Sequence, residues 1–282
     1  MLEGISYRLF GPIVRPYVGY FEPLQNELKR ADIKVPVDVY LSKLFFASML
    51  AFMITTITLS GIISYALLYP AYSYTLAIIL ASLAATLTFL SGYWYPSLKA
   101  KTLQREINKA LPFAAFYMTT VASSGTNPLE IFRILSLRGG VIGNEARKIY
   151  TNVKSLGLSL TTAIQRVASK TPSPEFADLL WGMISVITAG GDLEEYLKSK
   201  SEALMSKYRR SLTDYAKSIS FYTEIYITLI IVGSLFFIVL ISIVAPVTGI
   251  SVLFLQTFLV FFFIPLISIA YIILLKSISP LE

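Results

Sequence analysis

Residues 225–275 read IYITLIIVGSLFFIVLISIVAPVTGISVLFLQTFLVFFFIPLISIAYIILL, and this stretch contains no Asp, Glu, Lys or Arg. A second stretch without charged residues covers residues 44–98. About 20 apolar residues cross the hydrocarbon core of a bilayer as a helix, so each stretch has room for two crossings. The sequence therefore predicts an all-α membrane protein with four transmembrane helices in a two-plus-two arrangement around a helical bundle.

A short uncharged turn divides each stretch, at Tyr69–Ser73 and at Ala245–Gly249. We therefore expect four spans, at residues 44–69, 74–95, 225–244 and 252–275, with transmembrane helices 1 and 2 within 44–95 and helices 3 and 4 within 225–275. Pro265 is expected to bend the last span, because proline removes one backbone hydrogen bond from a helix.

The chain carries 24 Lys and Arg against 17 Asp and Glu, and neither short turn contains a basic residue. Cytoplasmic loops of membrane proteins are enriched in Lys and Arg. This rule predicts a multi-pass protein of the cytoplasmic membrane, with the N-terminal segment 1–43, the central segment 96–224 and the tail 276–282 in the cytoplasm. Arg8, Pro12 and Arg15 interrupt the apolar core that a signal peptide would need.

The central segment contains start and stop signals for five to seven helices, which is typical of a helical bundle. Asn127 and Asp192 each stand where a helix N-cap is expected, with an acidic residue three positions later. The expected helix ends and turns are at Gly125, Gly157, Gly190 and Gly191. Neither Gly nor Pro occurs between Asp192 and Val232, so one helix is expected to run from the central segment into the third span.

The composition excludes several classes of function. The chain has no Cys and no His, which removes disulfides, thiolate nucleophiles, zinc fingers and Ser-His-Asp triads. It has no G-x-x-x-x-G-K-[ST] motif, so it does not supply a P-loop nucleotide site. We expect no catalytic residues, no metal site and no cofactor. The basic residues have little aromatic interleaving, so no nucleic acid partner is expected.

Three stretches in order resemble one known family. Leu111-Pro112 is read as opening a helix that ends at Ser124-Gly125, Gly157-x-Ser159-Leu160 leads into Ala163-Ile164, and Ala189–Leu193 opens the long helix. Together they resemble the type II secretion system F domain over about residues 108–245. Upstream, Leu28–Ile33 and Asp38–Leu41 resemble the entry to the first span in tight-adherence pilus and archaeal versions, which often have Gly in place of Asp32.

This resemblance implies a membrane platform for assembling a type IV pilus-like filament, which is a pilus, an archaellum or a pseudopilus. Such platforms are thought to couple a hexameric secretion ATPase in the cytoplasm to pilin subunits in the membrane. Many relatives carry two such modules, so a second copy or a paralogous platform chain is the expected partner, beside the lipid bilayer. A small polytopic transporter or channel is the alternative, and the absence of charge inside the spans argues against it. A membrane enzyme ranks third.

The resemblance also directs attention to the basic residues. We expect an ATPase-facing patch at Arg133, Arg138, Arg147, Lys148, Arg166 and Lys170, whose alternative is an ordinary solvated surface. A membrane-proximal basic cluster is expected at Lys207, Arg209 and Arg210, where lipid headgroups and the ATPase are both open as partners.

Overall fold

The computed structural model describes residues 2–66, 70–248 and 252–278, and every regular element in these ranges is helical. Tyr69, Gly249 and residues 279–282, which belong to the two expected turns and the expected tail, lie outside the described ranges. The chain forms two compact units, residues 1–198 and 199–282. Four helices in the described part are long and apolar enough to cross a membrane, as the sequence predicts.

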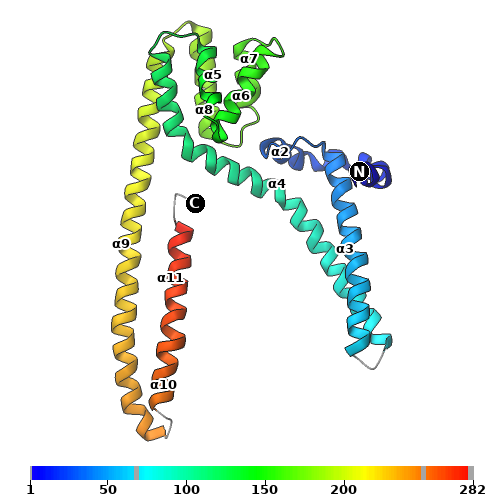
Figure 1. Cartoon of the computed structure of the whole chain (residues 1–282), viewed down its shortest axis with the longest axis vertical. Helices are drawn as coiled ribbons and strands as arrows, with labels where there is room; N and C mark the ends of the chain where they lie inside the picture. Colours follow the sequence, from blue (N-terminus) through cyan, green and yellow to red (C-terminus); the bar gives the residue numbers. More distant parts are fainter. Residues whose placement is uncertain (1, 67–69, 249–251, 279–282) are drawn as a thin grey trace. The chain divides into compact units, whose positions relative to one another are not determined.

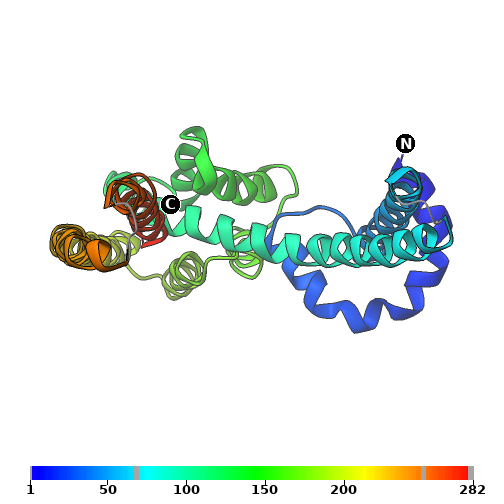
Figure 2. The ribbon, with the colours of Figure 1, turned by 90° about the horizontal axis from the view of Figure 1, so that it is seen from below.

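The first unit begins with an N-terminal segment that packs on a helical hairpin. This segment contains α1 (Leu2–Val14), η1 (Arg15–Phe21) and α2 (Glu22–Arg30), and the hairpin is α3 (Val37–Ala66) with α4 (Pro70–Ala122). Val14, Leu24, Leu28, Val37 and Leu41 form a buried cluster between the two parts. Figure 2 shows the segment, in dark blue, lying to one side of α3 and α4.

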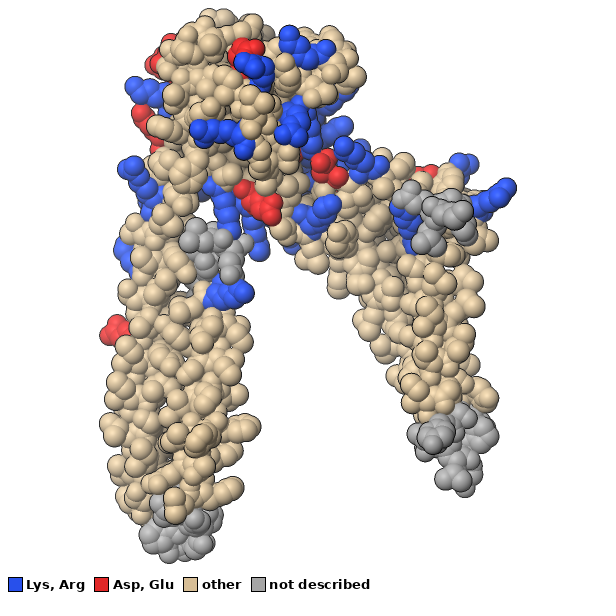
Figure 3. Space-filling model, viewed as in Figure 1, with Lys and Arg blue, Asp and Glu red and all other residues tan. Residues whose placement is uncertain are grey.

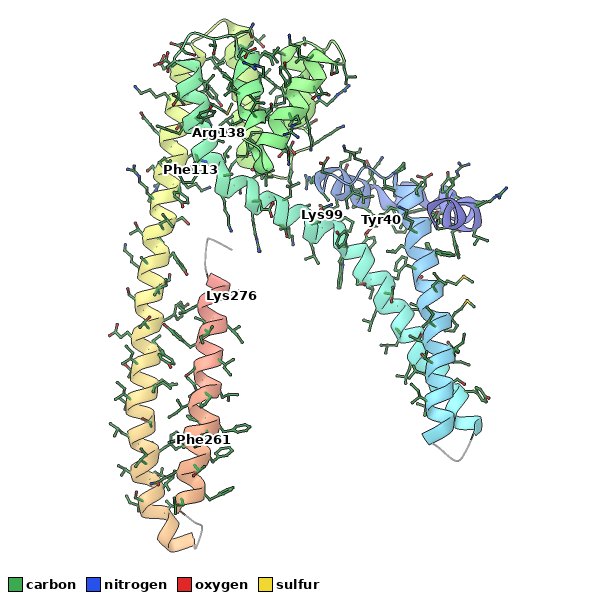
Figure 4. The ribbon with its side chains drawn as sticks, in the orientation of Figure 1. Tyr40, Lys99, Phe113, Arg138, Phe261 and Lys276 are labelled. Atoms are coloured by element: carbon green, nitrogen blue, oxygen red, sulfur yellow. The ribbon has the colours of Figure 1, made fainter. Side chains whose placement is uncertain are left out.

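Polar contacts hold the same parts together. The Tyr7 hydroxyl donates to the Asp38 carboxylate at 3.0 Å and accepts from Arg15 at 2.6 Å. The Tyr40 hydroxyl of α3 donates to the Gly92 carbonyl of α4 at 2.6 Å, and Figure 4 marks Tyr40 on α3. Ala77 and Ala81 on α4 are fully buried, which places small side chains where the two apolar helices approach closely.

The expectation that a helix starts at Leu111-Pro112 is wrong, because α4 continues through Pro96 and Pro112 to Ala122. Each proline removes one hydrogen bond and favours a kink, and Figure 1 shows α4 changing direction along its length. Ile107, Leu111, Ala115 and Met118 are fully buried. Packing along this face stabilises the helix on both sides of Pro112.

The remainder of the first unit is a bundle of short helices packed on the C-terminal half of α4. Its members are α5 (Pro128–Leu137), α6 (Gly140–Lys154), α7 (Leu160–Ala168), α8 (Pro174–Ala189) and the first turns of α9 (Leu193–Thr248). Phe132, Ile149, Ile164, Phe176 and Leu180 are almost completely buried. With α4 included, segment 96–224 contains six helices, within the expected range.

The second unit contains the remainder of α9, then α10 (Val252–Phe258), the π-helix η2 (Leu259–Phe263) and α11 (Ile264–Ile278). The Tyr226 and Tyr271 rings stack at 4.3 Å between centroids, and Tyr226 hydrogen-bonds Ser268 at 2.9 Å. These contacts join α9 to α11. As expected, α9 is continuous from the bundle into the third span.

Pro70 and Pro246 lie inside helices and not in the expected turns, and the last span contains a π-helix just before Pro265. Pro70 begins α4, and α9 continues past Pro246 to Thr248, so these helices include residues that were expected in the turns. Immediately before Pro265 the helix widens into the π-helix η2, in which the Ile264 N–H donates to the Leu259 carbonyl five residues earlier. Pro265 has no backbone N–H to donate, and the π turn is a local change of helix geometry directly before it.

Candidate functional site

The helix ends set the geometry of the bundle. The Asn127 side chain accepts from the Leu129 N–H at 2.9 Å and caps α5, and Asp192 accepts from Glu194 and Glu195 at 2.8 and 3.2 Å and caps α9. Gly125, Gly157 and Gly190 have φ values of +68°, +66° and +69°, which L side chains rarely adopt.

Gly190 and Gly191 end α8 so that α9 can return against it. The Gly191 N–H donates to the Val186 carbonyl at 2.9 Å, which closes the turn after the left-handed Gly190. On α9, the Tyr196 hydroxyl donates to the Leu179 carbonyl of α8 at 3.0 Å. The first turn of α9 is therefore fixed to α8.

The structure places the six residues of the expected patch in two groups. The first group surrounds the C-terminal end of α5 and consists of Arg133, Arg138 and Arg147. The Arg138 guanidinium lies over the Tyr117 ring of α4, 3.6 Å from its centroid, and Figure 4 marks Arg138 beside α4. The Arg147 guanidinium donates to the Ser136 carbonyl of α5 at 3.3 Å. Cations at a helix C-terminus are favourable, because backbone carbonyls there lack helical partners.

An apolar side chain stands among these arginines. Leu137 is 75% exposed and lies four residues after Arg133, on the same face of α5. Arg133 makes an ion pair with Glu130 but stays exposed. We name this surface the α5 face and define it by Arg133, Leu137, Arg138 and Arg147.

The second group lines a pocket with residues of α2. Lys148, Arg166 and Lys170 share this pocket with Lys29, Arg30 and Lys34, and we name it the basic pocket. Its volume is about 340 Å³, and its two acidic residues are Asp32 and Glu145. Figure 3 shows Lys and Arg side chains over α6, α7 and their junction with α2.

Lys148 engages both acidic residues of the basic pocket. Its ammonium lies 3.1 Å from the Asp32 carboxylate and 2.8 Å from the Glu145 carboxylate. Burial lowers the pKa of Lys148, but the hydrogen bonds and charges of Glu145 and Asp32 outweigh it, so the pKa lies above the ordinary value. Asp32 has a φ of +54°, where relatives are expected to have Gly, and its side chain ties the end of α2 to α6.

The sequence interpretation missed the contribution of α2 to this pocket. Lys29, Arg30 and Lys34 form a short basic run that could have signalled it, although nothing in the run indicates a contact with α7. The expected membrane-proximal cluster lies elsewhere, in the second unit, where Lys207, Arg209 and Arg210 are exposed on α9. Among the described residues there is no group of three or more His, Cys, Asp or Glu that could hold a metal ion.

Comparison with known proteins identifies the bundle. Residues 114–241 match the family described as type II secretion system (T2SS), protein F. We call this matched segment the F domain. The match begins in α4 and ends in α9, so the F domain includes the α5 face, most of the bundle and the helix that leaves it.

Three curated proteins are similar in sequence to about half of this chain. Flagella accessory protein J of Methanococcus voltae is 29% identical over 170 residues, which are 58% of this chain and 30% of that protein. Flagella accessory protein J of Methanocaldococcus jannaschii is 27% identical over 142 residues, 49% of this chain and 25% of that protein. An uncharacterized protein of M. jannaschii is 23% identical over 143 residues, 50% of this chain and 24% of that protein.

The matched region thus covers 24–30% of the length of these relatives. No solved structure matches the chain. The chain is a multi-pass membrane protein that contains this F domain and is similar to proteins named flagella accessory protein J.

Proposed function

We propose that this protein is the membrane platform of a type IV pilus-like filament, with the archaellum as the favoured assembly. The observation that carries the proposal is the F domain, which begins in one apolar helix long enough to cross a membrane and ends in another. In this function the chain catalyses no reaction. It receives conformational work from a secretion ATPase and transmits it to pilin-like subunits in the membrane.

We place the ATPase contact on the α5 face. Its side chains are exposed and include three arginines around an exposed leucine. Arginine is enriched among the residues that dominate binding energy at protein interfaces, and Leu137 adds apolar area that a partner can cover. Arg138 and Arg147 are also held in place by Tyr117 and Ser136, so they lose little conformational freedom on binding.

We assign the α9 cluster of Lys207, Arg209 and Arg210 to protein contacts rather than to lipid headgroups. Arg210 precedes Ile225, the first residue of the expected third span, by 15 residues. At about 1.5 Å per residue this separation is roughly 22 Å along the helix. Screening at physiological salt has a length of about 8 Å, so a membrane surface at Ile225 attracts these cations weakly.

The topology proposed with this function puts segment 96–224 and both termini in the cytoplasm, where the ATPase is. We also propose that the F domain works beside a second one, from another copy of the chain or from a paralogue.

Photo-crosslinking tests the ATPase contact directly. A photoreactive phenylalanine analogue at position 137 is expected to crosslink the full-length protein in membranes to a P-loop ATPase, identified by mass spectrometry. The matched control carries the analogue at Leu156, which is 59% exposed on the turn after α6. Crosslinks to the ATPase from both positions would remove the α5 face as the specific site. Crosslinks to no ATPase from either would contradict the proposed function.

A further inference from the structure

The basic pocket has an excess of positive charge that the described residues do not neutralise. Its six cations face two carboxylates, and both carboxylates bind Lys148. Arg30 has an ion pair with Glu27 at 3.7 Å. Within the ranges that the structure describes, no carboxylate pairs with the remaining four cations, which are Lys29, Lys34, Arg166 and Lys170.

These four cations come from different parts of the sequence. Lys29 and Lys34 lie at and after the end of α2, and Arg166 and Lys170 lie at and after the end of α7. All four side chains are exposed, so water and salt screen much of their mutual repulsion, but a concave basic site still focuses a positive potential that attracts anions. The Asp32–Lys148–Glu145 contacts hold the walls of the pocket together, because they join α2 to α6.

The shape and the neutral groups also suit an anion. A volume of about 340 Å³ corresponds to roughly ten water molecules, which accommodates a phosphate group and part of the molecule that bears it. Asn152 and Thr171 line the same pocket and can add uncharged hydrogen-bond donors. Lysine and arginine with such donors are the usual partners of phosphate oxygens.

We propose that the basic pocket binds a phosphate-bearing anion, held by Lys29, Lys34, Arg166 and Lys170 between α2 and α7. Two sources share this chemistry, the headgroup of an anionic phospholipid and a soluble phosphate compound. The lipid source rests on the topology proposed above. Lys34 lies three residues before α3, and Leu103 of the pocket lies eight residues after Tyr95, roughly 12 Å along α4 from the expected end of the second span.

The test compares two variants of the full-length protein with equal loss of charge. The pocket variant carries Lys29→Gln, Lys34→Gln, Arg166→Gln and Lys170→Gln. The control variant carries Lys154→Gln, Lys198→Gln, Lys217→Gln and Arg209→Gln, which are exposed cations outside the pocket. Circular dichroism and melting temperature check the fold of both. A double variant of Arg166 and Lys170 leaves α2 unchanged, in case the pocket variant does not fold.

Two probes distinguish the sources. Titration of inorganic pyrophosphate into detergent-purified protein measures soluble phosphate binding, and native mass spectrometry from nanodiscs containing phosphatidylcholine and phosphatidylglycerol measures lipid retention. For the probe that binds, the pocket variant is expected to bind roughly tenfold more weakly or worse, because several charge-assisted hydrogen bonds are lost. The control variant is expected to bind as the wild type does.

Saturable binding of pyrophosphate assigns a soluble ligand, and selective retention of phosphatidylglycerol assigns a lipid. If probe binding weakens equally in the pocket variant and the control variant, general surface charge explains the binding and the proposal is overturned. Absence of specific binding of both probes to the wild type would also overturn it. Neither probe requires an ATPase, so failure of this proposal can be distinguished from failure of the ATPase-coupled function.

Discussion

Gly182→Ala is the substitution for which the structure gives the sharpest expectation. Gly182 lies inside α8, where replacing Gly by Ala ordinarily stabilises a helix by about 1 kcal/mol. Here an added Cβ would lie 1.9 Å from the Tyr196 hydroxyl oxygen and 2.4 Å from the ring carbon that carries it. Carbon atoms prefer separations of about 3.5–4.0 Å, so the Tyr196 side chain must rotate away.

The cost of this rotation follows from what Tyr196 contacts. Its hydroxyl loses the hydrogen bond to the Leu179 carbonyl, which contributes about 1 kcal/mol. Its half-buried ring loses part of its apolar contact, up to about 2 kcal/mol. After subtracting the helix-propensity gain, Gly182→Ala is expected to lower the free energy of unfolding by about 2 kcal/mol.

A double-mutant cycle separates the clash from other effects. In a Tyr196→Ala background the added methyl has no ring to displace, so Gly182→Ala is expected to become stabilising by about 1 kcal/mol. The predicted coupling is therefore about 3 kcal/mol. Unfolding of the full-length protein in detergent can be followed by Trp181 fluorescence in a Trp94→Phe background. Stabilisation by Gly182→Ala in both backgrounds would refute the packing of the first turn of α9 on α8.

Three further predictions concern Asp32, Lys148 and the topology. Asp32→Gly is expected to leave stability within about 1 kcal/mol of the wild type, because glycine relieves the positive φ and this offsets the lost ion pair of half-exposed groups. Asp32→Ala loses the ion pair and keeps the positive φ, so thermal melts are expected to show a cost of about 1–2 kcal/mol. Because the pKa of Lys148 is raised above 10.5, its stabilising contribution is fully present below pH 10.5 and is lost as pH rises through the folded-state pKa. The stability difference between the wild type and Lys148→Met should therefore shrink over that pH range. A difference that stays constant would contradict the ion pairs of Lys148. The chain has no cysteine, so Leu156→Cys gives a single thiol, which an impermeant maleimide should label in inside-out vesicles and not in right-side-out vesicles; the opposite pattern would reverse the topology.

The fold was largely accessible from the sequence, because its signals are local. Uncharged stretches show where four apolar helices lie, and Asn127 and Asp192 stand at helix starts as N-caps do. The errors concern prolines. Pro112 was read as a helix start, yet buried neighbours such as Leu111 and Ala115 keep α4 continuous across it. Tertiary packing of this kind outweighs the local preference and leaves no local signal.

The candidate site was less accessible, because it depends on contacts between distant segments. The sequence predicts one patch of six basic residues, but the structure divides them into two groups. Arg147 donates to a carbonyl of α5, whereas the adjacent Lys148 pairs with Asp32. Neighbouring residues on a helix point in different directions, so sequence proximity did not imply one surface. Lys29 and Lys34 join the pocket only because the fold brings the end of α2 to the residues of α6 and α7 that line it, which no periodicity in the sequence records.

The most direct test of the platform function is co-purification of the ATPase from membranes solubilised in detergent, with and without ATP. The wild-type protein is compared with an α5-face variant, in which Arg133, Arg138 and Arg147 are each changed to Glu, and with the pocket variant as the control. We predict that a P-loop secretion ATPase co-purifies with the wild type and the pocket variant and is lost from the α5-face variant. Absence of such an ATPase from the intact wild-type protein under both conditions would contradict the platform function.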